Sequence, residues 1–433
     1  MPSVALYTLG CKVSQYETEA VAERFEERGF AVVPHTVSAD VYVINTCTVT
    51  AESDRKSRQV IRRMRAKNPD AVVAVIGCYS QRAPGEVAAV GADIVVGTEN
   101  KMSVVDMAIA MLGGSERGVI SVTDLEGAGF EPMSIKRAPR TRAYVKIEDG
   151  CEAKCTYCAI SGARGPVRSK PRCEVIREVK ALTAGGVREI VLTGIETGSY
   201  GRDFDTGYDL ADLILELDEL GAAERIRLGS LAPELIGESF ARKVSAAKSL
   251  TPHFHLSMQS GSDKTLRAMK RRYNRKMALD NVAALKRYIP GARFTTDLMV
   301  GFPGESEEDF LDTVSLVREI GFINCHVFAY SRREGTPAAL YDGQIPEAVK
   351  KRRSAELIRV ARETRDAVLD ELVGAGKPLS CILEVYSDGG YSAHSDEFAE
   401  VFIPAAPGKE GELVLVTPIS HKDGVITAEL ISD

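Results

Sequence analysis

Three cysteines within eight residues constrain this chain more than any other feature of its sequence. Cys151, Cys155 and Cys158 have the spacing C-x3-C-x2-C and directly follow residues 143–147, a run typical of a β-strand. Thiolates are soft ligands that select zinc, copper(I) or iron–sulfur clusters. A structural zinc site needs four ligands, and the nearest further candidate, Cys173, lies fifteen residues beyond Cys158. A four-iron cluster held by three thiolates would leave one iron open to a small molecule with its own amino and carboxylate groups.

Composition and cysteine usage limit the class of protein. The 433 residues are 44% hydrophobic and 27% charged, which is ordinary for a soluble globular protein of roughly two to four domains. No apolar run approaches the length of a membrane span, and the N-terminus lacks the pattern of a signal peptide. The nine cysteines are odd in number and lack a disulfide-framework spacing, which indicates a reducing, cytoplasmic setting. The net charge of −6 does not by itself indicate nucleic-acid binding.

Residues 1–124 are predicted to form an open parallel α/β domain. In three places an apolar run ends in a cysteine and a helix-like stretch follows, and these cysteines are Cys11, Cys47 and Cys78. Unbroken β-rich runs alternating with helices favour a parallel sheet covered on both faces. The carboxyl ends of such strands share one crevice, so thiols far apart in the sequence can converge there. The pattern alone leaves open a metal or cluster site and three separate buried thiols.

Residues 125–142 are interpreted as a linker, because Gly and Pro interrupt them and basic residues are frequent. Residues 143–372 are predicted to form a partial βα barrel and a basic helix. Six β-rich runs alternate with helical patterns there, whereas eight units would close a barrel. The chemistry of βα barrels lies on the loops after the strands. Besides the three cysteines, the notable residues after these strands are Gly194, Glu196, Ser230, Gln259 and Gly301.

The end of the chain has a different character. The basic helix predicted over 346–372 is interpreted as having a solvated charged face. Residues 373–433 are predicted to form a small antiparallel β-barrel, since short alternating runs lie between Gly, Pro and Asp turns. This last segment has three Lys, no Arg and ten Asp or Glu residues, so its formal charge is −7.

Taken together, these features resemble the radical S-adenosylmethionine (SAM) methylthiotransferases. The resemblance rests on the three-Cys α/β domain, the C-x3-C-x2-C barrel with Tyr157 before its last Cys, and the terminal barrel, which is similar to a TRAM domain. Residues 8–17, Thr-Leu-Gly-Cys-Lys-Val-Ser-Gln-Tyr-Glu, are most similar to the branch that acts on N6-threonylcarbamoyladenosine in tRNA, because the ribosomal-protein branch usually has Pro after this Cys. Further matches to the family pattern lie at residues 254–262, 269–273, 296–305 and 330–337.

The resemblance implies an enzyme with two [4Fe–4S] clusters and SAM. Cys151, Cys155 and Cys158 are expected to hold the cluster that binds and reductively cleaves SAM. The other set, Cys11, Cys47 and Cys78, is expected to hold an auxiliary cluster that carries the sulfur to be transferred. The cofactors supply the hard chemical step, so no general acid or base is expected. The residues expected to bind SAM are Tyr157, Gly194, Glu196, Ser230, Gln259 and Gly301.

The function implied by the resemblance is methylthiolation of N6-threonylcarbamoyladenosine at adenosine 37 of tRNA. The expected partners are tRNA and an electron donor such as a flavodoxin or ferredoxin, and the expected state is a cytoplasmic monomer without membrane contact. Phosphate contacts need Lys and Arg, which the acidic tail lacks, so we expect them on the loops of the barrel. The expected RNA-binding residues are Arg164, Arg168, Lys270, Arg271 and Arg272.

Two positions depart from the family pattern. Glu196 stands where relatives commonly have His, Asn or Gln, and Ala232 stands where they commonly have Glu. Either one carboxylate has moved across a strand or the two positions have drifted independently.

Several alternative functions are weighed beside the main one. They are methylthiolation of isopentenyladenosine in tRNA, methylthiolation of a ribosomal-protein residue, and non-catalytic RNA binding by a metal-stabilised protein. A cobalamin site in the N-terminal domain is disfavoured, because His35 lies outside the D-x-H-x-x-G loop that such sites use.

Overall fold

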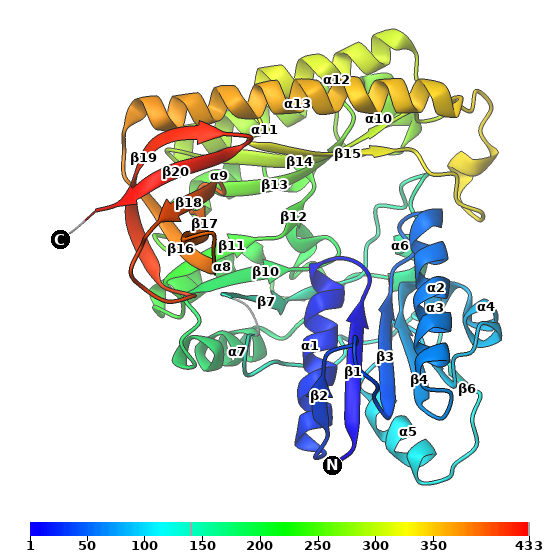
Figure 1. Ribbon diagram of the computed structural model, residues 1–433. Coiled ribbons are helices and arrows are strands. Elements are labelled where there is room, and N and C mark those ends of the chain that lie inside the picture. The colour runs from blue at the N-terminus through cyan, green and yellow to red at the C-terminus, as the bar shows by residue number, and fades with distance from the viewer. Residues whose placement is uncertain (139–140, 432–433) are drawn as a thin grey trace.

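The computed structural model describes residues 1–138 and 141–431 of the chain. An N-terminal α/β unit, a central βα barrel and a small C-terminal barrel follow one another in the sequence. Figure 1 shows the N-terminal strands directed toward the central barrel and the C-terminal strands packed beside it. The predicted linker includes residues 139 and 140, which lie outside the described residues. Within the described part of the chain, no helix is both long and apolar enough to cross a membrane.

The N-terminal unit contains a six-stranded sheet that is parallel throughout. Its strands are β1 (Ser3–Thr8), β2 (Ala31–Val33), β3 (Val41–Thr46), β4 (Val72–Gly77), β5 (Ile94–Val96) and β6 (Val119–Ser121). Their order is β2-β1-β3-β4-β5-β6, and β3 and β4 are buried along their whole length, as unbroken apolar runs predict. The helices are α1 (Lys12–Glu27), α2 (Ala51–Lys67), α3 (Cys78–Arg82), α4 (Pro84–Ala89) and α5 (Ser103–Leu112). The prediction of an open parallel α/β domain is confirmed.

Six main strands and one short strand line the central barrel. They are β7 (Arg142–Lys146), β10 (Glu189–Thr193), β11 (Arg225–Leu228), β12 (Ser230–Leu231), β13 (His253–Gln259), β14 (Arg293–Val300) and β15 (Asn324–Ala329). Neighbouring strands follow chain order, with β7, β10 and β11 in one sheet and β12 to β15 in another. Among the described strands β7 and β15 do not pair, so the barrel stays partial, as predicted.

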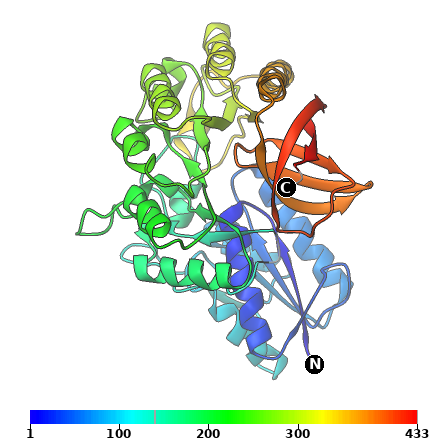
Figure 2. The same cartoon turned by 90° about the vertical axis from the view of Figure 1, so that its left-hand side faces the viewer.

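Helices cover the outside of this barrel. They are α7 (Arg172–Ala184), α8 (Leu210–Glu219), α9 (Glu238–Val244), α10 (Asp263–Ala268), α11 (Arg275–Tyr288), α12 (Glu307–Ile320) and α13 (Glu347–Ala375). The short helix α6 (Ile160–Arg164) instead lies beside α3 of the N-terminal unit (Figure 1). Figure 2 shows several of the outer helices nearly end-on, in an arc outside the strands. The carboxyl ends of the strands thereby remain free for the loops that carry the candidate site.

The C-terminal barrel is closed and has five strands. They are β16 (Leu379–Ser387), β17 (Gly390–Ser395), β18 (Glu400–Pro404), β19 (Leu413–Lys422) and β20 (Val425–Leu430). Four neighbouring pairs are antiparallel, as predicted, but β18 and β20 are parallel. The reason is geometric, because a closed ring with an odd number of strands cannot alternate direction at every step.

Helix α13 joins the two barrels and passes the predicted boundary at residue 372. Its residues Val368, Leu369 and Leu372 share one apolar cluster with the C-terminal strands. The interpretation of this helix as a solvated charged surface is wrong for Lys350 and Arg353, which are 6% and 4% exposed. Both are buried because the helix packs on the barrel, where Arg353 donates to a Glu305 carboxylate oxygen at 2.7 Å.

Candidate functional site

The loop with the C-x3-C-x2-C motif lies between strand β8 (Glu148–Asp149) and helix α6. Its entry is held by Gly150, whose φ is +95° and where a Cβ would lie only 1.8 Å from the carbonyl oxygen of Pro166. The backbone N–H of Cys151 donates to the carbonyl of Gly165 at 3.0 Å. A glycine is therefore required for the close approach that starts this loop.

The three sulfurs of this loop lie in a setting suited to metal ligands. The backbone N–H of Ile160 points at the Cys158 sulfur at 3.3 Å, and Arg271 donates from Nη1 to the Cys155 sulfur at 3.5 Å. Burial raises the pKa of Cys151 to about 12, so this thiol is neutral until a metal displaces its proton. The donor set and the hydrogen bonds to sulfur fit the [4Fe–4S] cluster that the motif predicts.

Two carboxylates lie beside this loop. Glu148 is buried, and its Oε2 accepts from the backbone N–H of Glu196 at 2.9 Å. Its Oε1 has no hydrogen-bond partner among the described residues. Gly194 provides the space, since a Cβ there would lie 2.5 Å from Glu148 Oε2. Burial raises the pKa of Glu148 well above its usual value, so only a nearby cation would favour its charged form.

Glu196 reaches across the rim of the barrel. Its Oε1 accepts from the backbone N–H of Ala232 at 3.0 Å, and both residues border a small hollow together with Cys151. Burial raises the pKa of Glu196 to about 7, although the nearby Arg271 guanidinium lowers it. A cationic ligand in this hollow would therefore favour the charged carboxylate.

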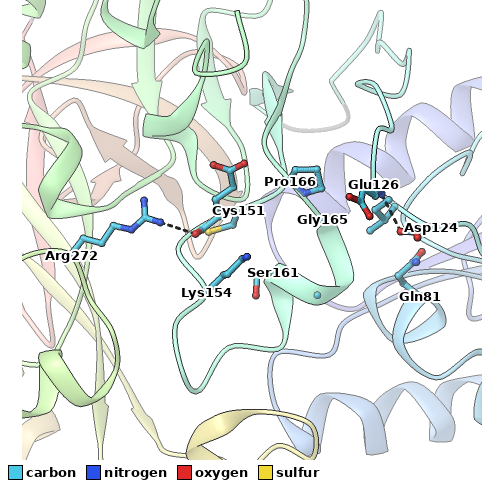
Figure 3. A pocket seen from close by; sticks show the side chains of 12 residues that line it. Gln81, Asp124, Glu126, Cys151, Lys154, Ser161, Gly165, Pro166 and Arg272 are labelled. Carbon is cyan, nitrogen blue, oxygen red and sulfur yellow. Dashed lines mark hydrogen bonds between the residues drawn. The ribbon is translucent and has the colours of Figure 1, made fainter.

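A larger hollow of about 850 Å³ lies on the outer side of the same loop. Figure 3 shows Cys151, Lys154 and Arg272 on one side of it and Gln81 and Asp124, from the N-terminal part of the chain, on the other. Arg272 is exposed and donates to the backbone carbonyl of Glu152 in this loop at 2.8 Å. The loop thus has one face that is accessible from solvent.

A third hollow, of about 200 Å³, lies between the two cysteine-bearing regions. Its lining includes Cys158 from the barrel loop and Val49, two residues after Cys47. Most of the wall is apolar or aromatic, and Asp297 is the one charged residue among its described lining residues. The other residues that line it are Thr50, Tyr157, Ala159, Ile160, Gln259, Met299, Phe328, Ala329, Tyr330 and Ser331.

Asp297 is held by two histidines that sequence reasoning missed. Its Oδ2 lies 3.3 Å from His255 Nε2 and its Oδ1 lies 3.2 Å from His326 Nδ1. Although burial raises the pKa of Asp297, these hydrogen bonds hold it well below the usual range. The three side chains come from three different strands, so no local spacing could have indicated the group.

The other three cysteines converge at the carboxyl ends of adjacent strands, as predicted. Cys11 follows β1, Cys47 follows β3 and Cys78 follows β4. A Cβ at Gly10 would lie 3.4 Å from the Cys47 Cβ, and the Cys47 sulfur accepts from the backbone N–H of Val49 at 3.5 Å. Burial raises the pKa of Cys47 and raises that of Cys78 to about 12.

Single-ion and cluster sites place different demands on the three thiols. Among the residues that the structure describes, no three His, Cys, Asp or Glu side chains are grouped as ligands of one metal ion. In a four-iron cluster each thiolate binds a different iron, so the ligands need not meet at one point. Three thiols at neighbouring strand ends are the ligands that the predicted auxiliary cluster would need.

The structure corrects part of the predicted RNA-binding set. Arg164 is fully buried and Arg168 is 4% exposed, so the prediction that these two residues contact RNA is wrong. Both are held by internal carboxylates, which offset the cost of burying their charge. Arg271 is half-buried and directed at Cys155, whereas Lys270 and Arg272 are exposed.

The remaining predicted SAM residues lie at several places on the barrel. Tyr157 and Gln259 line the hollow beside Cys158, and Ser230 is half-buried on β12. Gly301 has a φ of +73°, and a Cβ there would lie 2.4 Å from Lys350 Cγ, so it is packed against helix α13.

Comparisons with known proteins agree with this geometry. The radical SAM superfamily matches residues 145–317, and a family described as uncharacterized protein family UPF0004 matches residues 3–97. The threonylcarbamoyladenosine tRNA methylthiotransferase MtaB of Bacillus subtilis is 38% identical over 96% of this chain and 93% of its own length. The tRNA-2-methylthio-N(6)-dimethylallyladenosine synthase of Moorella thermoacetica is 35% identical over 98% of both chains.

Solved structures show a related fold. The radical S-adenosylmethionine methyltransferase TsrM from Kitasatospora setae, with cobalamin and a [4Fe–4S] cluster bound, has a TM-score of 0.58. It is 16% identical, and the match covers 78% of this chain and 77% of that one. The likeness at this identity concerns the fold alone.

Proposed function

Because the chain belongs to the family of radical SAM tRNA methylthiotransferases, we propose that it methylthiolates N6-threonylcarbamoyladenosine at adenosine 37 of tRNA. It is a radical SAM enzyme that binds a [4Fe–4S] cluster and SAM. The substrate is supported by 38% identity to a threonylcarbamoyladenosine tRNA methylthiotransferase over 93% of that protein. The resemblance of residues 8–17 to the same branch points in the same direction.

The observation that carries this proposal is the hollow between the two thiol sets. It is bordered by Cys158 on one side and by Val49, beside Cys47, on the other. A substrate in this hollow would lie between both predicted cofactor sites. Phe328 and Met299 offer it apolar surface and exclude water, and Asp297 accepts hydrogen bonds from N–H groups of a base.

We assign the cofactors to the following side chains. Cys151, Cys155 and Cys158 hold the first cluster, which together with SAM supplies a radical able to activate an unreactive carbon–hydrogen bond. Glu196 is proposed to bind a cationic group of SAM, because it borders the same small hollow as Cys151. The second cluster is a further part of the proposal, and it is assigned to Cys11, Cys47 and Cys78.

The partners follow from the same assignment. Exposed Lys270 and Arg272 lie beside the cluster loop and are assigned to the tRNA backbone. A flavodoxin or ferredoxin is proposed as the electron donor, and the enzyme is proposed to act as a cytoplasmic monomer.

Mass spectrometry of tRNA nucleosides from cells with and without this protein tests the function. We expect the 2-methylthio group on N6-threonylcarbamoyladenosine to be lost and to return with the parent chain, but not with Cys155→Ala. Loss of the 2-methylthio group from dimethylallyladenosine instead would show that this protein acts on the nucleoside named for the M. thermoacetica relative. Unchanged tRNA nucleosides with a mass change in a ribosomal protein would assign a protein substrate. If neither the tRNA nucleosides nor the ribosomal proteins change, and the reconstituted protein does not cleave SAM, the protein is an RNA-binding protein without this enzymatic activity.

A further inference from the structure

One buried guanidinium connects the two cysteine-bearing regions. Arg164 is the last residue of α6, the helix that begins just after Cys158. Its Nε donates to the Cys78 sulfur at 3.1 Å. A side chain from the first loop therefore touches a thiol of the second set.

The same guanidinium is fixed by two carboxylates. Its Nη1 donates to Glu17 Oε1 at 2.6 Å and to Asp149 Oδ2 at 3.1 Å, and its Nη2 donates to Glu17 Oε2 at 3.2 Å. Glu17 belongs to α1 and Asp149 precedes the first cysteine loop, so the guanidinium joins three segments of the chain. The planar fork of Arg allows these contacts at once, which a Lys ammonium could not reproduce.

Other charged side chains surround this guanidinium. Lys146 donates to Glu17 and to Asp149, at 2.9 Å and 2.5 Å, and Lys101 lies 3.3 Å from Glu17 and 3.0 Å from Glu131. Arg168 is a further cation, with its Nη2 3.7 Å from Asp149 Oδ2. All seven side chains are buried, at 8% exposure or less. Ion pairs from several sides hold the guanidinium in one position.

We propose that Arg164 is a positioning residue that hydrogen-bonds the Cys78 ligand of the auxiliary cluster and thereby raises the reduction potential of that cluster. The proposal rests on the proposed function, in which Cys78 is a cluster ligand. Hydrogen bonds to cluster sulfurs and nearby charge are among the means by which proteins set these potentials. An N–H donor stabilises the additional negative charge of the reduced state more than that of the oxidised state.

The test uses the full chain with Cys151, Cys155 and Cys158 replaced by Ala, so that only the auxiliary cluster is reconstituted. The first measurement is its midpoint potential with and without Arg164→Lys. We expect Arg164→Lys to bind equal iron and sulfide and to have a more negative potential, because the charge remains but the N–H to sulfur contact is lost. Arg168→Lys is the matched control, since Arg168 is also buried and donates to the Arg164 carbonyl at 2.9 Å. Its potential should equal that of the parent.

The second measurement needs no change at Arg164. With 15N-labelled arginine, pulsed electron paramagnetic resonance of the reduced auxiliary cluster should show a weak coupling to one arginine nitrogen. Absence of this coupling, or equal potentials in the parent and Arg164→Lys, overturns the role of Arg164. If Arg164→Lys does not fold, the coupling in the unchanged chain decides. If the parent binds no auxiliary cluster at all, the assignment of the second cluster fails and the role of Arg164 fails with it.

Discussion

The Glu196 carboxylate accepts a hydrogen bond from the backbone N–H of Ala232 at 3.0 Å. Glu196 follows β10 and Ala232 lies after β12, so the two loops adjoin on the rim, as the chain order of the strands predicts. The Glu196 side chain is therefore held on the rim and is not directed into solvent. The contact is what a carboxylate moved across one strand would make, and it lies beside Cys151.

Glu196→Gln is predicted to weaken SAM binding about tenfold, which corresponds to one charge-assisted hydrogen bond of roughly 1.5 kcal/mol. The amide oxygen can still accept from Ala232, so the loop should keep its shape. Because burial raises the pKa of Glu196 to about 7, the parent should bind SAM more tightly as the pH rises through neutrality, and Glu196→Gln should not. Equilibrium binding of SAM to the reconstituted protein measures both effects.

Two further variants sharpen this test. Glu152→Gln is the control, because Glu152 is exposed on the same rim and should leave the SAM affinity within about twofold. Adding Ala232→Glu to Glu196→Gln should restore much of the affinity. Parent-like binding by Glu196→Gln at every pH would show that its charge does not face SAM.

Substitutions in the two cysteine sets are predicted to abolish different steps. Cys155→Ala should abolish SAM cleavage, because the loop then keeps only two ligands, while the auxiliary site still binds iron. Cys47→Ala should retain SAM cleavage, lose about half of the iron and stop sulfur transfer. Iron analysis and quantification of 5′-deoxyadenosine check these outcomes, with exposed Cys173→Ala as the control. Full methylthiolation by Cys47→Ala would show that the auxiliary site is misassigned.

The double variant Lys270→Ala, Arg272→Ala is predicted to weaken tRNA binding. The affinity of this variant should also fall less steeply with salt, with the magnitude of the slope of log affinity against log salt concentration reduced by about one to two. Both residues are exposed beside the cluster loop. The control is Arg287→Ala, an exposed cation in the last turn of α11, at the other end of the barrel. Iron content must be unchanged, because Arg272 also donates to the loop carbonyl of Glu152. Equal affinities for both variants would place the RNA elsewhere.

Acid is predicted to loosen the contact between the two barrels through His253. Its ring stacks on Phe398 of the C-terminal barrel with centroids 4.3 Å apart, and its Nε2 lies 2.9 Å from Thr295 Oγ1. Burial, and then the nearby charges of Arg227, His255, Lys12 and Arg142, hold the pKa of His253 well below its usual value. The unfolded chain therefore binds a proton that the folded chain does not, and stability falls as the pH drops below about 6.5.

The free energy of unfolding should fall by up to about 1.4 kcal/mol per pH unit because of His253. His253→Gln keeps a partner for Thr295 and should show a shallower loss of the urea unfolding midpoint between neutral and mildly acid pH. His35→Gln, in the N-terminal unit, is the control and should follow the parent. Identical pH profiles for the parent and His253→Gln would contradict the assignment.

The sequence by itself indicated the main strands of the N-terminal unit and of the central barrel, and the placement of cysteines at strand ends. Unbroken apolar runs identify β3 and β4, because strands buried on both faces need no polar alternation. The cysteines follow strand ends, and parallel strands present those ends at one edge, so the convergence of Cys11, Cys47 and Cys78 could be predicted from local pattern.

Only the tertiary structure decided which charged residues are inside. Arg164 was predicted to bind RNA, yet its carboxylate partner Glu17 lies 147 residues earlier in the chain. A charge is buried only where distant segments supply partners that offset its desolvation, and local sequence does not contain that information. The same holds for Asp297. Its partners His255 and His326 lie on neighbouring strands and come within hydrogen-bond distance of it only when β13, β14 and β15 pair.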